Sequence, residues 1–284
     1  MTKIILVTGT STGLGISIAV QAAQAGHTVY ATMRNLDKRA NLDAAAAAAG
    51  VSLTVLPLDV SDSASVNSAV DEIIARQGRI DVLVNNAGAG FVRTIEQATE
   101  AEIQAVMDVN FTGVARCTKA VMPHMRKQRS GHIVTISSVG GLVGQPFNEI
   151  YCAAKFAVEG FMEAMACYIT PNFGIEFTLV EPGGIATEFI ANVMKQVGAT
   201  GGILDDEYKP ILEAYVGGAQ NRGGQSAYQT PDQVAEVVLS TIQSGEPPLR
   251  IRTSEWAETL CHPKTGLDPD GRKLSAQVTK QFLG

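Results

Sequence analysis

The chain has 284 residues, of which 45% are hydrophobic and 18% charged, and its formal net charge is −6. This length and composition predict a folded chain with a large core and exclude a disordered one. An acidic balance without a basic cluster excludes nucleic acid as an expected partner. No apolar run approaches the ~20 residues that span a bilayer, and we find no secretory signal. We therefore expect a cytoplasmic protein without a membrane span.

Four cysteines and four histidines are scattered along the chain. No two cysteines form a CxxC pair, and none has a neighbour at metal-ligand spacing. We therefore expect reduced thiols and no metal site.

Apolar segments alternate with helical patterns along most of the chain. Helix signals include Gly78 as a C-cap and the capping boxes that begin at Thr99 and Thr230. Alternation of this kind predicts an α/β fold: a Rossmann-type doubly wound parallel sheet with helices on both faces, in a single domain over 1–284. The predicted strands are 3–8, 28–33, 53–57, 80–84, 132–136, 176–180 and 249–252.

Two regions interrupt this pattern. Residues 188–229 are rich in glycine, and we interpret them as a substrate lid that orders when substrate binds. The tail 253–284 is polar, contains the only tryptophan, Trp256, and shows no clear period.

A glycine-rich turn, Thr8–Gly15, follows the first strand and opens a helix. Glycines at 9, 13 and 15 permit a tight turn and the close approach of a pyrophosphate to the backbone. The start of the helix then offers unpaired N–H groups to the anion. Because of this position between strand and helix, the turn predicts a dinucleotide site.

The end of the second predicted strand indicates which dinucleotide. Met33 stands where an NAD site generally has a carboxylate, and Arg34 follows it. A guanidinium can grip a 2′-phosphate with paired hydrogen bonds, which favours NADP(H). Alternatively, Arg34 is a solvated loop residue, and Asp37, within reach of a ribose, keeps NAD(H) possible.

The catalytic hypothesis starts from Tyr151 and Lys155, which share one helix face at i and i+4. Ser138 precedes them at the end of a strand, and Asn110 lies in a helical pattern further upstream. A phenol has a pKa near ~10, which a nearby ammonium lowers toward the range useful for proton transfer.

These residues together resemble the short-chain dehydrogenase/reductase family along the chain to about residue 190. Asn110, Ser138, Tyr151 and Lys155 match the family's catalytic tetrad in order. Segments 30–34, 85–90 and 180–184 are most similar to its NADP-preferring 17β-hydroxysteroid and retinol dehydrogenase branch. Gly184 and the loop 188–229 depart from that branch. The other matching segments are Thr8–Gly15, Leu58–Val60, Asn85–Gly88 and Pro182–Thr187.

The resemblance implies a hydride transfer between nicotinamide and a carbonyl or secondary alcohol. Tyr151 is then the acid or base, Lys155 lowers its pKa and holds ribose, Ser138 binds the substrate oxygen, and Asn110 holds a proton-relay water. The implied cofactor-binding residues are Gly9, Ser11, Thr12, Gly13, Leu14, Gly15, Arg34, Asp59, Val60, Asn86, Ala87, Gly88, Tyr151, Lys155, Pro182, Gly183, Ile185 and Thr187.

The substrate is expected to be a hydrophobic small molecule. The expected substrate-binding residues are Ser138, Gly140, Leu142, Val143, Phe147, Tyr151, Phe189 and Tyr215. For the apolar ones, ordinary packing is the alternative.

Several other interpretations stay open. Asn110 could be an exposed helix residue, Asp59 could cap the next helix, and Asn85 could close a strand end. The alternative activities are an NAD-dependent alcohol dehydrogenase, a 3-oxoacyl thioester reductase and a non-catalytic NADP sensor. The resemblance also implies a homodimer or homotetramer through helices near 100–127 and 151–170.

Overall fold

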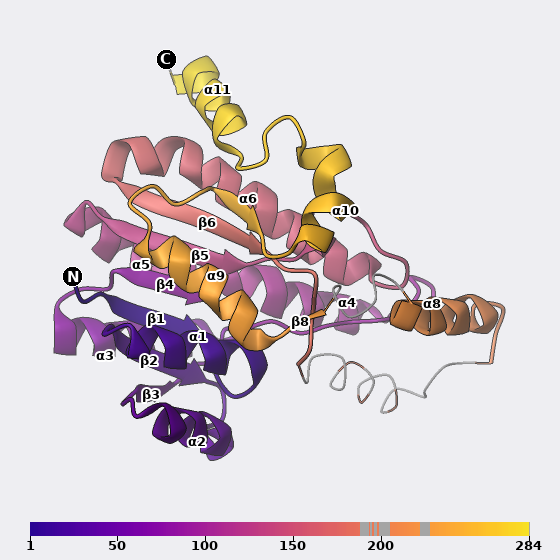
Figure 1. The fold of residues 1–284 in the computed structure, drawn as a ribbon, viewed down its shortest axis with the longest axis horizontal. Helices are drawn as coiled ribbons and strands as arrows, with labels where there is room; N and C mark the ends of the chain where they lie inside the picture. The colour runs from indigo at the N-terminus through magenta and orange to yellow at the C-terminus, as the bar shows by residue number, and fades with distance from the viewer. Residues whose placement is uncertain (188–192, 194, 196–197, 199–204, 222–227, 284) are drawn as a thin grey trace.

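Seven apolar segments form one parallel sheet in the computed structural model, which describes residues 1–187, 193, 195, 198, 205–221 and 228–283 (Figure 1). The order across the sheet is β3-β2-β1-β4-β5-β6-β9, and every neighbouring pair is parallel. All seven predicted strands are confirmed, with ends that differ by at most two residues. They are β1 (Ile4–Thr8), β2 (Thr28–Met33), β3 (Thr54–Pro57), β4 (Val82–Asn85), β5 (Gly131–Ile136), β6 (Ile175–Glu181) and β9 (Arg250–Arg252).

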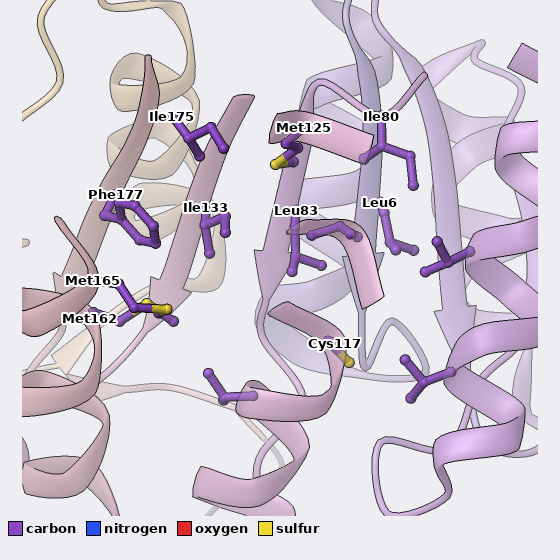
Figure 2. Packing of buried hydrophobic residues seen from close by; sticks show 14 of the residues in the cluster. Leu6, Ile80, Leu83, Cys117, Met125, Ile133, Met162, Met165, Ile175 and Phe177 are labelled. Atoms are coloured by element: carbon purple, nitrogen blue, oxygen red, sulfur yellow. The ribbon is translucent and has the colours of Figure 1, made fainter. Parts of the chain in front are cut away.

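Helices cover both faces of the sheet because each carries an apolar stripe. One face packs against α1 (Gly13–Gln24), α2 (Ala40–Ala49) and α9 (Pro231–Gln243). The other face packs against α3 (Ser63–Gln77), α5 (Gly113–Gln128) and α6 (Glu149–Phe173). Figure 2 shows this second layer, where Leu83, Ile133 and Phe177 of the strands face side chains of the helices. The predicted Rossmann-type single domain is confirmed.

The order of strands reverses between β1 and β4, so the connections that leave the carboxyl ends of these two paired strands run in opposite directions. In doubly wound sheets this switch point is where ligands bind. Two short helical turns, η1 (Leu36–Lys38) and η3 (Val139–Gly141), follow the carboxyl ends of β2 and β5. The fold therefore predicts a ligand site at the loops after β1, β4, β5 and β6.

Local signals fix the helix boundaries. Thr99 and Thr230 form the predicted capping boxes at the starts of α4 (Glu100–Met107) and α9. Gly78 ends α3 in the left-handed conformation, as predicted. Between α4 and α5 the helix widens into one π turn, η2 (Asp108–Thr112), a feature frequent at functional sites.

The polar tail forms two helices, α10 (Glu255–Thr265) and α11 (Arg272–Leu283). Ser254 caps α10, whose Ala257 and Cys261 are one turn apart and buried against Val139 and Leu142. The buried residues of α10 are the small Ala257, Cys261 and Thr265, which is why the sequence showed no clear apolar period. Within the described part of the chain, no helix has both the length and the apolar character needed to cross a membrane.

The region of the predicted lid is described only in part. Gly184–Ile185 (β7) pairs in parallel with Tyr228–Gln229 (β8), and Lys209–Asn221 form α8. In Figure 1, α8 lies beyond the end toward which the strands point.

Candidate active site

The turn after β1 is shaped for a ligand that approaches the backbone closely. Gly9 and Gly13 have φ of +71° and +56°, in the left-handed region that favours glycine. A Cβ on Gly15 would lie 2.3 Å from the carbonyl oxygen of Gly9. Thr12 precedes α1 but its side chain makes no capping bond, so the first N–H groups of α1 stay available to an anion.

The loop after β4 is fastened to this turn. The Asn86 side-chain amide donates to the carbonyls of Thr8 (2.9 Å) and Gly9 (3.0 Å). The main-chain amides of Asn86 and Ala87 both donate to Thr8 Oγ1. Asn85, by contrast, points into the protein and donates to hydroxyls of α5 and β5. Asn86 therefore shapes the turn, whereas Asn85 braces the sheet.

Arg34 follows the buried Met33 and is exposed. No hydrogen bond or ion pair holds its guanidinium among the residues that the structure describes, so it is available to a ligand. The nearby Arg39, in contrast, pairs with Asp43 at 2.8 Å.

Asp59 lies after β3 and accepts a hydrogen bond from the amide of Ser61. The cap of α3 is Asp62 rather than Asp59, so the capping alternative for Asp59 was wrong. The Val60 carbonyl accepts from Arg116 on α5, which holds this predicted cofactor-binding loop in place.

Tyr151 and Lys155 project from α6 toward the end of β5. The Tyr151 hydroxyl is hydrogen-bonded to the Ser138 side chain. Lys155 Nζ donates to the carbonyl of Ile136 at 2.9 Å and lies 5.7 Å from the centre of the Tyr151 ring. A Cβ on Gly140 would be 3.3 Å from Ser138 Oγ and 3.5 Å from the Tyr151 ring. The three predicted catalytic side chains therefore converge, with glycine leaving space beside them.

Asn110 lies in the π turn and is fully buried, so the alternative of an exposed helix residue was wrong. Its amide donates to the carbonyls of Ala89 (2.9 Å) and Val106 (3.0 Å), and its oxygen accepts from the Ala89 amide. A Cβ on Gly88 would lie 3.0 Å from Asn110 Oδ1 and 3.9 Å from Lys155 Nζ. Asn110 and Lys155 thus flank the same glycine.

Burial shifts the acid–base groups in opposite directions. It raises the pKa of Tyr151 to about 12, although the hydrogen bond from Ser138 works against this. It lowers the pKa of Lys155 to about 8, opposed by the negative charge of Glu159. In this state Tyr151 carries its proton and Lys155 is mainly an ammonium at neutral pH.

The loop after β6 closes over the glycine turn. Its Pro182 carbonyl accepts from the Val139 amide, which ties it to the end of β5. Gly183 and Ile185 lie in the segment that follows. A Cβ on Gly13 would lie 3.1 Å from Thr187 Cγ2, so Thr187 stands directly against the turn.

The predicted substrate residues divide into two groups. Phe147 is buried in a left-handed conformation (φ +62°), its ring 5.6 Å from that of Tyr215, whose hydroxyl accepts from Asn148. Leu142 and Val143 instead pack with α10 in a small apolar cluster. Phe189 lies outside the described residues.

Sequence reasoning missed a buried charged cluster behind Ser138. Glu159 and Glu181 are 5% and 0% exposed, and Arg250 and Arg252 of β9 lie beside them. Glu159 follows Tyr151 and Lys155 at the next i+4 step of α6. This spacing is visible in the sequence and could have predicted that Glu159 shares their helix face.

With this geometry in view, comparison with known proteins decides the family. The family model described as short chain dehydrogenase matches residues 3–198. The chain belongs to the short-chain dehydrogenase/reductase family. It is accordingly an oxidoreductase of CH–OH and C=O groups, and the predicted family and branch are confirmed.

Three relatives show how far the likeness extends. Retinol dehydrogenase 8 of Bos taurus is 41% identical over 275 residues, which cover 95% of this chain and 86% of that protein. Human 17-beta-hydroxysteroid dehydrogenase type 1 is 36% identical, with 99% and 86% covered. The crystal structure of a short-chain dehydrogenase from Streptomyces avermitilis has a TM-score of 0.77 and 30% identity, with 99% of each chain covered.

Proposed function

We propose that this enzyme is an NADP(H)-dependent oxidoreductase of hydrophobic ketones or secondary alcohols. The observation that carries the proposal is the Ser138–Tyr151 hydrogen bond with Lys155 buried beside it, next to the glycine turn. A buried amine and a buried phenol whose pKa values are both shifted, side by side and next to a binding turn, are typical of a catalytic site.

The glycine turn and the loops after β4 and β6 fit a dinucleotide. Space at Gly9, Gly13 and Gly15, together with the uncapped start of α1, suits a pyrophosphate. The nicotinamide cofactor, when bound, gives or takes the hydride. The residues that would hold it are those implied by the family resemblance, from the turn, Arg34, the Asp59–Val60 and Asn86–Gly88 loops, Tyr151, Lys155 and the Pro182–Thr187 segment.

Tyr151 and Ser138 act on the substrate oxygen. In the reductive direction, Tyr151 Oη donates its proton to the carbonyl oxygen as negative charge develops there, and Ser138 hydrogen-bonds the same oxygen. The product is the alcohol, and Tyr151 is left as a phenolate beside the Lys155 ammonium. In the oxidative direction Tyr151 takes the proton back.

Asn110 supports proton return to Tyr151. Its side-chain oxygen accepts one hydrogen bond, from Ala89, and has a second lone pair toward the Gly88 side, where Lys155 Nζ also lies. We therefore assign it the role of holding a water that links Lys155 to solvent.

NADP(H) is preferred over NAD(H) because Arg34 is exposed and unpaired in the described structure, while the buried Met33 offers no carboxylate to a ribose. Asp37, also exposed, is the residue on which an NAD preference would depend.

The substrate is a hydrophobic small molecule. Phe147, four residues before Tyr151, forms an aromatic pair with Tyr215, and the two curated relatives are named for a retinoid and a steroid. Gly140, with Ser138 and Tyr151, leaves space for the reacting carbon. Leu142, Val143 and Phe189 remain predicted contacts, and part of 188–229 the predicted lid.

We also propose a cytoplasmic homodimer or homotetramer through the helices near 100–127 and 151–170. An exposed stripe on the outer face of α6 supports this. Between Ala153 and Tyr168, its residues follow one another at steps of three or four and are all small or aromatic: Ala153, Phe156, Gly160, Ala164 and Tyr168. Such a face permits close helix packing.

The test is a screen of hydrophobic ketones with NADPH and NADH, using wild type and Tyr151→Phe. We expect turnover with NADPH, and a loss of about 10²–10⁴-fold in kcat for the variant, because the proton donor is gone. NADPH binding, followed by its fluorescence, should persist in the variant, because only one of the residues that would hold the cofactor is changed and its ring is kept. A variant as active as wild type would contradict the role of Tyr151. Cofactor binding without turnover of any ketone or alcohol would favour a non-catalytic sensor.

A further inference from the structure

Glu159 belongs to the same face of α6 as the predicted catalytic residues. It follows Lys155 by four residues and Tyr151 by eight, so the three side chains stand one above the other on the helix. The residue is 5% exposed and has no role in the mechanism above. A buried carboxyl group one turn from a buried ammonium needs an explanation.

These three side chains bind three consecutive residues at the end of β5. Tyr151 binds Ser138, and Lys155 binds the carbonyl of Ile136. Glu159 Oε1 accepts a hydrogen bond from the hydroxyl of Ser137, the residue between them. Glu159 therefore fastens the strand end that carries Ser138.

The fit around Ser137 is close. The Ser137 amide donates to the Val180 carbonyl of β6 at 2.8 Å. A Cβ on Gly141 would lie 2.7 Å from Ser137 Oγ and 3.0 Å from Glu159 Oε1. The turn after Ser138 thus packs directly on the Ser137–Glu159 hydrogen bond.

Glu159 lies beside Glu181 of β6. Glu159 Oε2 and Glu181 Oε1 are buried, and while both groups are ionised neither oxygen has a hydrogen-bond partner among the described residues. A proton on one carboxyl group allows a hydrogen bond between the two and satisfies these atoms. Burial raises the pKa of both groups. The hydrogen bond from Ser137 opposes this at Glu159, whereas the charge of Glu159 adds to it at Glu181 and raises the pKa of Glu181 to about 9.

Charged side chains surround this pair on several elements. Arg250 contacts Glu163 and lies 3.7 Å from Glu181, and Arg252 contacts both Glu181 (3.1 Å) and Glu258 (2.6 Å). The thiol of Cys261 on α10 also faces the pair, and burial raises its pKa to about 11, so it is neutral. The charged groups around the pair are the cations Lys155, Arg250 and Arg252 and the carboxylates Glu163, Glu258 and Asp268.

From this arrangement we propose that Glu159 is a positioning residue: an ionised carboxylate that keeps Lys155 charged and holds the strand end carrying Ser138. Glu181 is the protonated partner that lets the Glu159 carboxylate exist in the interior. The inference rests on the proposed function for its catalytic meaning, but the state of Lys155 can be measured without turnover.

The experiment is an NMR titration of Lys155 in the full chain labelled with ¹³C-lysine, with the signal assigned by Lys155→Met. In Glu159→Gln we expect the pKa of Lys155 to fall by about one unit, because a neighbouring negative charge is lost. Glu163→Gln is the matched control, one turn further along α6 and paired with Arg250, and should change it little. A Lys155 titration in Glu159→Gln that equals wild type would overturn the proposal.

Glu181→Gln tests which carboxyl group carries the charge. The side-chain amide that this substitution introduces can donate to Glu159 as the protonated acid does, so Lys155 should titrate as in wild type. A fall as large as that expected for Glu159→Gln would place the charge on Glu181 and overturn the assignment. If circular dichroism shows that Glu159→Gln does not fold, the Lys155 titration in Glu181→Gln alone decides which carboxyl group carries the charge.

The catalytic consequence is read from the pH profile of kcat/KM. The alkaline limb should move about one unit lower in Glu159→Gln and stay in place in Glu163→Gln. If wild type turns over no substrate, the proposed function fails, whereas the Lys155 titration still upholds or overturns the role of Glu159.

Discussion

Around Gly9–Gly15 the structure offers space and main-chain N–H groups, whereas around Ser138–Lys155 it offers buried side chains that hold one another. The first region depends on the absence of Cβ atoms: one on Gly15 would lie 2.3 Å from a carbonyl oxygen. The second depends on hydrogen bonds from Tyr151 and Lys155 to the end of β5. Sterics therefore govern the proposed cofactor side, and burial and charge govern the proposed acid–base side.

The strongest test of this contrast is Gly15→Ala. The new methyl group would press on the carbonyl of Gly9 and on the Asn86 amide, 2.6 Å away, so the turn must open. We expect NADPH affinity to fall by about 100-fold or more, or ~2.7 kcal/mol, measured by cofactor fluorescence. Circular dichroism should show a folded protein with a lower unfolding midpoint.

Gly245→Ala is the matched control, since no atom lies within 4 Å of the added Cβ and the residue is exposed and not in the left-handed region. It should bind NADPH as wild type does. Gly15→Ala with unchanged affinity would show that the turn tolerates a side chain and that the steric account of this region is wrong.

The two regions also differ in how well the sequence predicted them. A turn built from glycines and a helical Tyr151/Lys155 pair are local patterns, so their positions were predicted correctly and the strands with them. The Glu159–Glu181 pair joins α6 to β6 across the fold, and only the tertiary structure brings the two carboxyl groups together. The left-handed Phe147 and the packing of Leu142 on α10 likewise depend on distant segments.

Burial also shifts the pKa of His132, which lies at the opposite end of β5 and has no role in the proposed reaction. Its ring donates to Thr178 Oγ1 at 2.9 Å, because that hydroxyl already donates to the Pro248 carbonyl. Burial lowers the pKa of His132 to about 3 from an ordinary 6.5. Since the unfolded chain takes up a proton below pH 6.5 and the folded one does not, stability is lost as pH falls from about 6.5 to 3.

We therefore expect His132 to cost about 2 kcal/mol of unfolding free energy between pH 7 and pH 5. Urea unfolding at the two pH values should show this loss in wild type and a smaller one in His132→Gln, which keeps a donor toward Thr178. His124→Gln on α5 provides the control. An equal loss in wild type and His132→Gln would mean that His132 is not the group responsible.

The smallest expected effect concerns the edge of the cofactor side, where a single exposed side chain decides between two cofactors. Arg34→Ala should weaken NADPH binding by about 10-fold, the value of a charge-assisted contact at an exposed site, and leave NADH binding nearly unchanged. Arg39→Ala is the matched control, because that guanidinium is already paired with Asp43.

The outcome of this comparison also decides how far the steric account extends. A specific loss of NADPH binding would show that the charge of Arg34 selects NADPH over NADH, whereas the glycine turn accommodates both cofactors. Equal binding of NADPH and NADH in wild type, unaffected by Arg34→Ala, would contradict the NADP preference. Asp37 would then become the residue to test, with Asp37→Asn expected to weaken NADH binding instead, because the carboxylate that could hold the ribose hydroxyls would be gone.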